Sequence, residues 1–164
     1  MAEIRIRDIE EKDYARIVGL NEAVVQQTSF MDMQRLRLLD DLSSYRRVAV
    51  VDGQVAAFLL AIEDGAPYEN DNFNWFSSRY RNFLYVDRIV VGSDYAGLKI
   101  GSLLYKDLFE YVHSRGIEYI ACEYNIEPPN PASRAFHDKF GFKESGTQWV
   151  AGGTKRVSLQ IAKV

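Results

Sequence analysis

The sequence contains few of the residues that metal centres and disulfide frameworks require. It has one cysteine, Cys122, and two histidines, His113 and His137, among 164 residues. One cysteine has no partner for an internal disulfide, and three such residues far apart in the sequence lack the clustering that is typical of a zinc site. We therefore expect no metal, and we interpret Cys122 as a small buried residue of an apolar strand rather than as a nucleophile.

Charge and hydropathy argue against two further classes of partner. The chain has 20 Lys and Arg against 23 Asp and Glu, a net charge of −3 with no basic run, so the electrostatic footprint of a nucleic-acid-binding protein is missing. No apolar run reaches the length of a membrane span, and residues 1–5 enter an alternating strand pattern rather than a cationic and apolar signal. We expect no nucleic-acid partner, no membrane partner and a cytoplasmic location.

The length and the apolar content suit one compact domain. Of the 164 residues, 47% are hydrophobic, which is enough for a substantial core, and we expect residues 1–164 to form a single domain. Residues 4–7 alternate as a strand does, and Asp8 followed by Glu11 resembles a capping box for a helix whose apolar positions continue to Val25. Asp32 predicts the start of a second helix.

The middle of the chain predicts a hairpin and then a long loop. Residues 46–51 and 54–63 are rich in strand formers and are joined by Asp52-Gly53, a strong two-residue hairpin signal. From Asp64 to Asn82, turn formers alternate with aromatic residues, which predicts a long, ordered, aromatic-bearing loop. The loop either has a functional role or is a flap over the sheet edge or a dimer contact, and a homodimer stays open.

The second half of the chain predicts alternating strands and helices. Strands are expected at residues 83–91 and 117–124, helices from Ile100 to before Gly116 and from Asn130-Pro131 to Gly141, and two final strands around Gly152-Gly153. The expected order is β, α, α, β, β, β, α, β, α, β, β. This order predicts an α+β fold with flanking helices and a mostly antiparallel mixed sheet, in which a parallel pair flanks a crossover helix.

The most informative segment is the turn between the strand at 83–91 and the helix that begins at Ile100. It contains Gly97 and Gly101, and it leads into a helix start, where backbone N–H groups lie at the positive end of the helix dipole. Such a turn holds phosphate without a dedicated side chain, so the sequence predicts a phosphate-bearing ligand. Lys99 either adds a cation near a pyrophosphate or is simply solvated.

At this point the chain resembles the GNAT superfamily of acyl-CoA-dependent N-acyltransferases, over essentially its whole length. In that family a strand leads into a Gln/Arg-x-x-Gly-x-Gly/Ala turn and a helix, and a later Asn-started helix ends in Gly-Phe. Here residues 96–101 are AGLKIG and residues 130–142 are NPASRAFHDKFGF. Ala96 and Lys99 depart from the pattern. The resemblance implies a GNAT-like fold and acyl transfer from acetyl-CoA, or a related acyl-CoA, to a primary amine within a ternary complex.

The ligand contacts that we expect come partly from the residues and partly from the resemblance. Backbone amides of the turn and the first helical residues suit a pyrophosphate. The resemblance implies that the strand before the turn pairs with the pantetheine arm, although the same residues also suit a plain core strand. It also implies a role near the arm or the adenosine phosphate for Asn130 and Ser133, although Asn130 is equally a helix cap. The expected contacts are Ile89, Val90, Val91, Gly97, Leu98, Lys99, Ile100, Gly101, Ser102, Asn130 and Ser133.

Acyl transfer to an amine needs a base and benefits from an acid. Asp87 is the leading base candidate because it lies on the strand expected to hold the arm, although it also suits an ion pair with an arginine. Glu123, on the next parallel strand, is the second candidate with the same alternative. The resemblance gives His137 as the acid, since it matches a family tyrosine four residues before Gly-Phe. His137 also suits an ordinary surface position, four residues after Ser133.

The acceptor and the class of protein stay open at this stage. Tyr124 and Asn125 end a strand where they would line an acceptor cleft, and acidic residues in the first helices favour a cationic amine, either a small metabolite or a protein. A second class is an acyl-CoA-binding regulatory or interaction module that has lost catalysis, which the replaced tyrosine and the atypical turn allow. A third is an unrelated nucleotide-binding protein, which would retain ATP or NAD more tightly than CoA.

Overall fold

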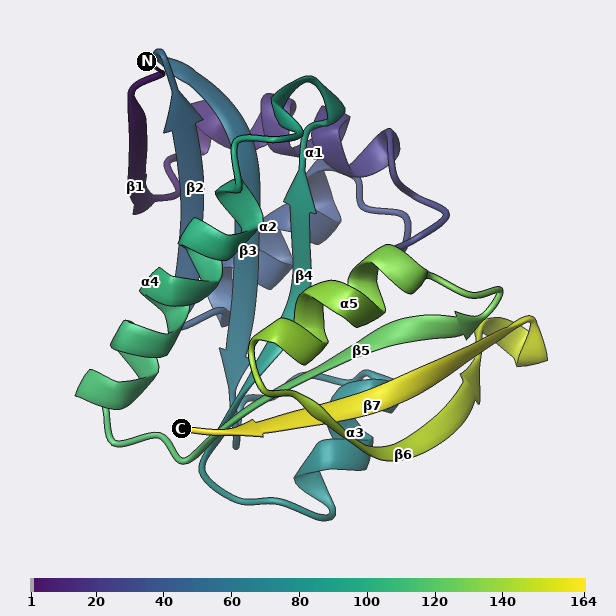
Figure 1. Ribbon diagram of the computed structural model, residues 1–164. Coiled ribbons are helices and arrows are strands. Elements are labelled where there is room, and N and C mark those ends of the chain that lie inside the picture. Colours follow the sequence, from purple (N-terminus) through teal and green to yellow (C-terminus); the bar gives the residue numbers. More distant parts are fainter. Residues whose placement is uncertain (1) are drawn as a thin grey trace. The chain divides into compact units, whose positions relative to one another are not determined.

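The strands form one mixed sheet, which Figure 1 shows in a computed structural model that describes residues 2–164. The strand order is β1-β2-β3-β4-β5-β7-β6, with β4 and β5 as the parallel pair, so the predicted fold class is confirmed. Backbone packing groups the chain into two compact units. The first holds the residues up to Ile62 and Val86–Tyr111, and the second holds Glu63–Tyr85 and Val112–Val164.

The first unit is a set of antiparallel strands with helices on both faces. Its elements are β1 (Ile4–Asp8), α1 (Tyr14–Glu22), α2 (Met33–Leu42), β2 (Tyr45–Val51), β3 (Gln54–Glu63, its last residue in the second unit), the later part of β4 (Phe83–Val91) and most of α4 (Ile100–Ser114). Figure 1 shows α4 on one face of β2 and β3, and α1 and α2 on the other. Leu36 and Leu39 of α2 and Leu104 and Leu108 of α4 are fully buried, so both faces are packed.

The β2–β3 hairpin forms as its turn residues predict. Asp52 and Gly53 have φ of 48° and 85°, the left-handed pair that a two-residue hairpin turn requires. The register runs from Tyr45 opposite Ala61 to Val51 opposite Gln54.

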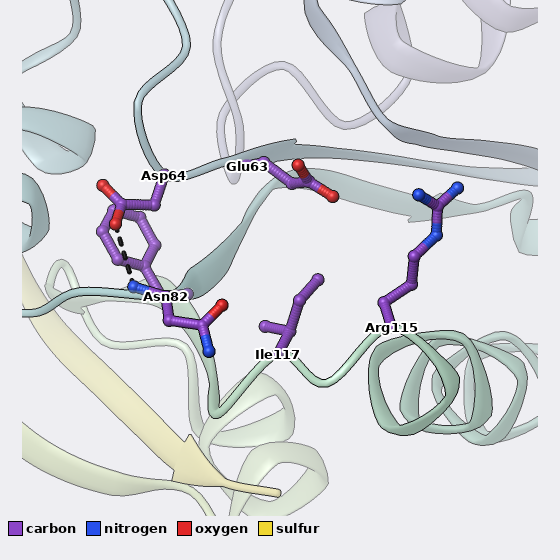
Figure 2. A pocket seen from close by; sticks show the side chains of 6 residues that line it. Glu63, Asp64, Asn82, Arg115 and Ile117 are labelled. Carbon is purple, nitrogen blue, oxygen red and sulfur yellow. Dashed lines mark hydrogen bonds between the residues drawn. The ribbon is translucent and has the colours of Figure 1, made fainter.

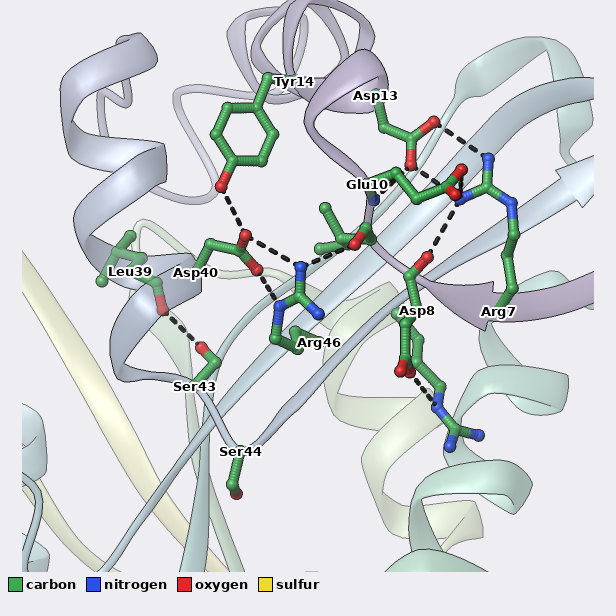
Figure 3. Close-up of polar contacts among 12 residues, drawn as sticks. Arg7, Asp8, Glu10, Asp13, Tyr14, Leu39, Asp40, Ser43, Ser44 and Arg46 are labelled. Carbon is green, nitrogen blue, oxygen red and sulfur yellow. Dashed lines mark hydrogen bonds and ion pairs between the residues drawn. The ribbon is translucent and has the colours of Figure 1, made fainter.

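A buried carboxylate joins the first helices to the hairpin (Figure 3). Asp40 of α2 is 5% exposed and accepts a 2.5 Å hydrogen bond from the Tyr14 hydroxyl of α1. The Arg46 guanidinium of β2 donates to both oxygens of Asp40 and, at 2.6 Å, to the carbonyl of Ile9. Each buried polar group of this cluster thus has a partner from another element, which fixes how α1, α2 and β2 pack together.

The first helix begins and ends differently from the prediction. Asp8 belongs to β1, and the reciprocal cap is made by Asp13, whose carboxylate accepts from the Glu10 amide at 2.8 Å before α1 starts. The helix stops at Glu22 rather than at Val25 because the buried Asn21 side chain donates to the carbonyl of Ser29 at 2.8 Å, which turns the chain away. The second helix starts as predicted, since Asp32 accepts from the Arg35 amide at 2.8 Å.

The second unit also has a helix on each face of its strands. Its elements are α3 (Asp71–Ser77), the first residues of β4, β5 (Tyr119–Glu127), α5 (Pro131–Lys139), β6 (Lys143–Val150) and β7 (Lys155–Lys163). The parallel ladder joins Phe83–Tyr85 of β4 to Tyr119–Ala121 of β5, and β7 pairs antiparallel with β5 and β6. Figure 1 shows α5 on one face and α3 on the other.

The prediction of one long loop between Asp64 and Asn82 is wrong, because α3 lies within it. The Asn70 carboxamide oxygen accepts from the amides of Asn72 and Phe73 at 3.0 and 3.1 Å, so it caps the helix. Phe73 and Phe76, three residues apart, are 3% and 0% exposed. Burial of these two rings, rather than intrinsic helix propensity, stabilises so short a helix.

Candidate functional site

Two residues in the turn before α4, Gly97 and Lys99, have left-handed backbone conformations. Gly97 and Lys99 have φ of 89° and 58°, and the carbonyl of Lys99 accepts from the Leu103 amide at 3.1 Å, so Lys99 is the cap residue directly before α4. Lysine therefore occupies a left-handed position that a residue without Cβ adopts far more readily. The residues from Gly97 to Lys99 are exposed.

The amides of this turn are partly engaged within it. The Leu98 amide donates to the carbonyl of Tyr95 at 3.4 Å. The N–H groups in the first turn of an α-helix have no acceptor inside the helix, which leaves the start of α4 as an anion-binding position. The segment that leads from β4 to this turn is bound to β3, because the Gly92 N–H donates to the carbonyl of Ala56 at 2.8 Å.

Asp87 lies in a buried ion pair of the first unit. Its side chain is 3% exposed, and the Nε of the adjacent Arg88, 4% exposed, donates to it at 2.8 Å. Arg88 also donates to Asn21 Oδ1 at 3.2 Å and to the carbonyl and hydroxyl of Ser29, both at 3.1 Å. The Asp87–Arg88 pair therefore ties β4 to the end of α1 and to the segment that follows it, as the ion-pair alternative expects.

Glu123 is the centre of a polar chain in the second unit. This half-buried carboxylate of β5 accepts on Oε1 from the hydroxyl of Tyr85 in β4 and from Nδ2 of Asn72 in α3 at 2.8 Å. The Asn72 oxygen in turn accepts from Nε2 of Gln148 in β6 at 2.9 Å. Three elements thus meet at one carboxylate, and β6 joins them through Asn72. These two donors to Glu123 are neutral, whereas Asp87 accepts from a guanidinium.

Helix α5 begins as its sequence predicts. The side chain of Asn130 accepts from the Ser133 amide at 3.3 Å, and Pro131 is the first helical residue. Asn130 therefore has the capping role that the sequence analysis gives as an alternative. Ser133 is half-buried, and its carbonyl accepts from His137 Nδ1 at 2.7 Å.

His137 is a packed residue rather than a surface one. It is 4% exposed and its ring lies about 5.5 Å from that of Tyr124 and 5.3 Å from that of Phe142. Burial lowers the pKa of His137, so the imidazole is neutral at pH 7, with its proton on Nδ1 toward Ser133. Burial also raises the pKa of Tyr124, whose hydroxyl accepts from Gln160 Nε2 at 3.2 Å.

The predicted site residues fall into two groups. The first unit carries Asp87, residues 89–91 and residues 97–102, and the second carries Glu123 together with Asn130, Ser133 and His137 of α5. The sequence analysis does not name the partners of Glu123, which are Asn72, Tyr85 and Gln148. The one sequence signal for this helix is Asn70 as a cap ahead of Phe73 and Phe76 at helical spacing, and the aromatic loop prediction did not use it.

A separate hollow lies at the start of β4 (Figure 2). Its volume is about 450 Å³, and it is lined by Glu63, Asp64, Asn82, Phe83, Arg115 and Ile117. The Asn82 amide donates to Asp64 Oδ2 at 2.9 Å across its edge. None of the predicted site residues lines it.

Two further kinds of feature are absent from residues 2–164. In this part of the chain no three His, Cys, Asp or Glu side chains are grouped so that they would hold a metal ion. No helix in it is long and apolar enough to cross a membrane.

A family model described as "Acetyltransferase (GNAT) family" matches residues 5–142. No curated protein sequence gives a significant match to the chain. The family match covers both the turn at residues 96–101 and helix α5, the two segments that carry the sequence resemblance.

Solved structures with the same fold cover nearly the whole chain. Ard1 from Thermoplasma volcanium is 14% identical with a TM-score of 0.81, covering 98% of this chain and 97% of its own. The ribosomal-protein-S18-alanine N-acetyltransferase from Escherichia coli is 15% identical with a TM-score of 0.75, covering 99% and 94%. A GNAT-family acetyltransferase from Streptococcus pneumoniae is 22% identical with a TM-score of 0.74, covering 99% of both chains. At these identities the similarity shows the fold.

Proposed function

The chain belongs to the acetyltransferase (GNAT) family, and from that membership we propose that it moves the acetyl group of acetyl-CoA to a primary amine. The amine nitrogen attacks the thioester carbonyl directly while both substrates are bound. A C–N bond replaces the C–S bond, a base takes one proton from the nitrogen, and the sulfur of CoA leaves as a thiolate that then gains a proton. Much of the acceleration comes from holding the two substrates together.

The turn that starts α4 is the observation that carries the acetyl-CoA part of the proposal. It has two left-handed residues, Gly97 and Lys99, directly before the helix, so the amides of Ile100 and Gly101 suit the CoA pyrophosphate. Lys99 is exposed and adds a cation beside the phosphates. The backbone of residues 89–91 would pair with the pantetheine amides, and Asn130 and Ser133 would approach the arm or the adenosine phosphate.

For the base we favour Glu123 over Asp87. The Asp87 carboxylate is 3% exposed and is bound by the Arg88 guanidinium, so an amine cannot readily reach it. Glu123 is only half-buried, and its donors Tyr85 and Asn72 are neutral. Positioned proton transfer contributes about 10²–10⁴-fold, so we expect Glu123→Gln to lower kcat by at least about 10²-fold.

His137 requires a second proton before it can serve as an acid. Its proton lies on Nδ1 toward the Ser133 carbonyl, so a donor at Nε2 requires the imidazolium, which burial disfavours. A thiol with a pKa of about 8.5 leaves readily as its anion, so an acid adds little to this step. We expect His137→Phe and Asp87→Asn to retain most of the turnover if they fold, and large losses in both would reinstate them as acid and base.

The test is release of CoA thiol from acetyl-CoA by the purified chain with a panel of amines. The panel contains a peptide with an N-terminal alanine, phosphinothricin and a linear polyamine. The first two follow solved structures of this fold, a ribosomal-protein-S18-alanine N-acetyltransferase and a putative phosphinothricin N-acetyltransferase, and the third follows from the net charge of −3. Amine-dependent thiol release supports the proposal, whereas no CoA binding by calorimetry would overturn it.

A second candidate function is an acyl-CoA-binding module without catalysis. The observation that favours it is His137, buried and neutral where family members carry a tyrosine. This candidate predicts that the chain binds CoA and that the binding depends on Lys99. It also predicts that no amine of the panel causes thiol release.

A further inference from the structure

The neutral amides of Asn72 and Gln148 form a chain that ends on the Glu123 carboxylate. Asn72 Nδ2 donates to Glu123 Oε1 at 2.8 Å, and Gln148 Nε2 donates to Asn72 Oδ1 at 2.9 Å. The Tyr85 hydroxyl donates to the same oxygen of Glu123. These residues come from α3, β4, β5 and β6, all in the second unit.

The direction of this chain matches an ionised Glu123. An ionised carboxylate only accepts hydrogen bonds, so Asn72 must turn its NH₂ group toward Glu123 and its oxygen toward Gln148, which must then present its own NH₂ group. A protonated carboxyl can also accept, but it is a weaker acceptor than a carboxylate. Two donors on one oxygen of Glu123 therefore favour its charged form, the form that a base requires.

The element that presents Asn72 is held firmly in place. Phe73, the next residue of α3, is 3% exposed, and Trp75 lies against Gly146 of β6, so close that a Cβ there would come within 2.5 Å of the indole. Asn70 caps the helix. Because α3 is anchored on both sides of Asn72, little conformational entropy is lost when the Asn72 amide binds Glu123.

We propose that Asn72, oriented by Gln148, is a positioning residue that fixes the direction and the ionised state of the Glu123 carboxylate. The inference rests on the proposed function, in which Glu123 is the base. Two donors on Oε1 set the plane of the carboxylate and so the direction of Oε2. Neither Asn72 nor Gln148 takes part in proton transfer, since a carboxamide is too weak an acid and too weak a base near neutral pH.

The test is the pH titration of the Glu123 side-chain carboxyl signal by ¹³C NMR, assigned with Glu123→Gln. Tyr85 of β4 is a titratable group in contact with Glu123, while α3 and β6 contribute the neutral Asn72 and Gln148, and β7 places Leu159 opposite Glu123. Asn72→Leu removes a donor to the charged form, so we expect the pKa of Glu123 to rise by about one unit, a tenfold change in proton affinity.

Two further variants allow the test to give an answer even where Asn72→Leu does not fold. Gln148→Met removes only the outer, half-buried amide, and we expect a smaller rise in the same direction. Asn74→Leu is the matched control, because Asn74 lies on the same helix but bonds to Glu69 at 3.3 Å at the surface, and it should leave the titration of Glu123 unchanged. An unchanged Glu123 pKa in Gln148→Met and in a folded Asn72→Leu would overturn the inference.

Kinetics with the best amine of the panel separate the inference from the function on which it rests. We expect Asn72→Leu to lower kcat. We also expect the acidic limb of the pH profile of kcat/KM to move to higher pH, by the same shift that the NMR titration shows. A normal acidic limb in that variant, with transfer by the wild type intact, would overturn the positioning role alone. Failure of the wild type to acetylate any amine of the panel would instead overturn the proposed function.

Discussion

The indole of Trp75 in α3 lies directly against the backbone of Gly146 in β6. A Cβ on Gly146 would come within 2.5 Å of the ring atom Cζ2, closer than packed atoms approach. Gly146 also lies where the β6–β7 register shifts, between Glu144 and Gly146. The absence of a side chain at this position therefore lets α3 dock on the sheet.

Gly146→Ala should destabilise the protein. The indole would have to move out of its packed position, and overpacking of this kind costs about 1–3 kcal/mol. Urea unfolding followed by tryptophan fluorescence would measure the loss and report the ring directly. Gly19→Ala is the control, since Gly19 lies inside α1 and a Cβ there would meet nothing within 4 Å, so it should raise the free energy of unfolding by about 0.5–1 kcal/mol. Equal stability of Gly146→Ala and the wild type would contradict this account.

Lys99→Gly should stabilise the chain. Lys99 has φ of 58°, a conformation that costs a residue with a Cβ about 1–2 kcal/mol, and the gain is reduced by the greater freedom of glycine in the unfolded chain. We expect a net rise of about 1 kcal/mol in the free energy of unfolding. Lys99→Ala removes the charge but keeps the strained backbone, so it should show no such rise, and a gain as large as that of Lys99→Gly would show that strain is not the cause.

Arg88→Met should be strongly destabilising. It leaves the Asp87 carboxylate, 3% exposed, without its guanidinium partner, and breaking a buried ion pair in this way costs about 3–5 kcal/mol. The double variant Asp87→Leu, Arg88→Met removes both charges and should recover much of the loss. Chemical denaturation of the three proteins would measure this recovery, and a double variant no more stable than Arg88→Met would show that the pair is not the source of the effect.

Tyr14 should make stability depend on pH in the alkaline range. Burial, followed by the hydrogen bond to Asp40, raises the pKa of Tyr14 from 10 to about 12. Since the folded protein holds this proton more tightly than the unfolded chain, the contribution is complete below pH 10 and is lost as the pH rises from 10 to 12. Two pKa units correspond to about 2–3 kcal/mol.

The measurement is the difference in unfolding free energy between the wild type and Tyr14→Phe, taken at several pH values. The difference cancels the titration of other groups, so it isolates the hydroxyl at position 14. We expect it to be largest near pH 8 and to shrink between pH 10 and 12. A difference that stays constant over this range would mean that Tyr14 keeps an ordinary pKa.

Much of the fold follows from local signals in the sequence. Asp52-Gly53 predicted the hairpin because few residues tolerate two consecutive left-handed conformations. Asp32 and Asn130-Pro131 predicted helix starts because their side chains satisfy amides only a few residues away. Helix α3 was missed because its stability comes from burying Phe73 and Phe76 against other elements, which local pattern alone does not reveal.

The sequence by itself determined the family resemblance, the order of most strands and helices and the turn at residues 97–101, since these depend on residues close together in the chain. Only the tertiary structure decided what surrounds the two candidate carboxylates. In the sequence both lie on strands, with Asp87 as the leading candidate, but folding places Asp87 against Arg88 and Glu123 against the neutral side chains of Tyr85 and Asn72. The physical reason is that the proton affinity of a carboxylate depends on its neighbours in space, and here two of them come from segments 38 and 51 residues away.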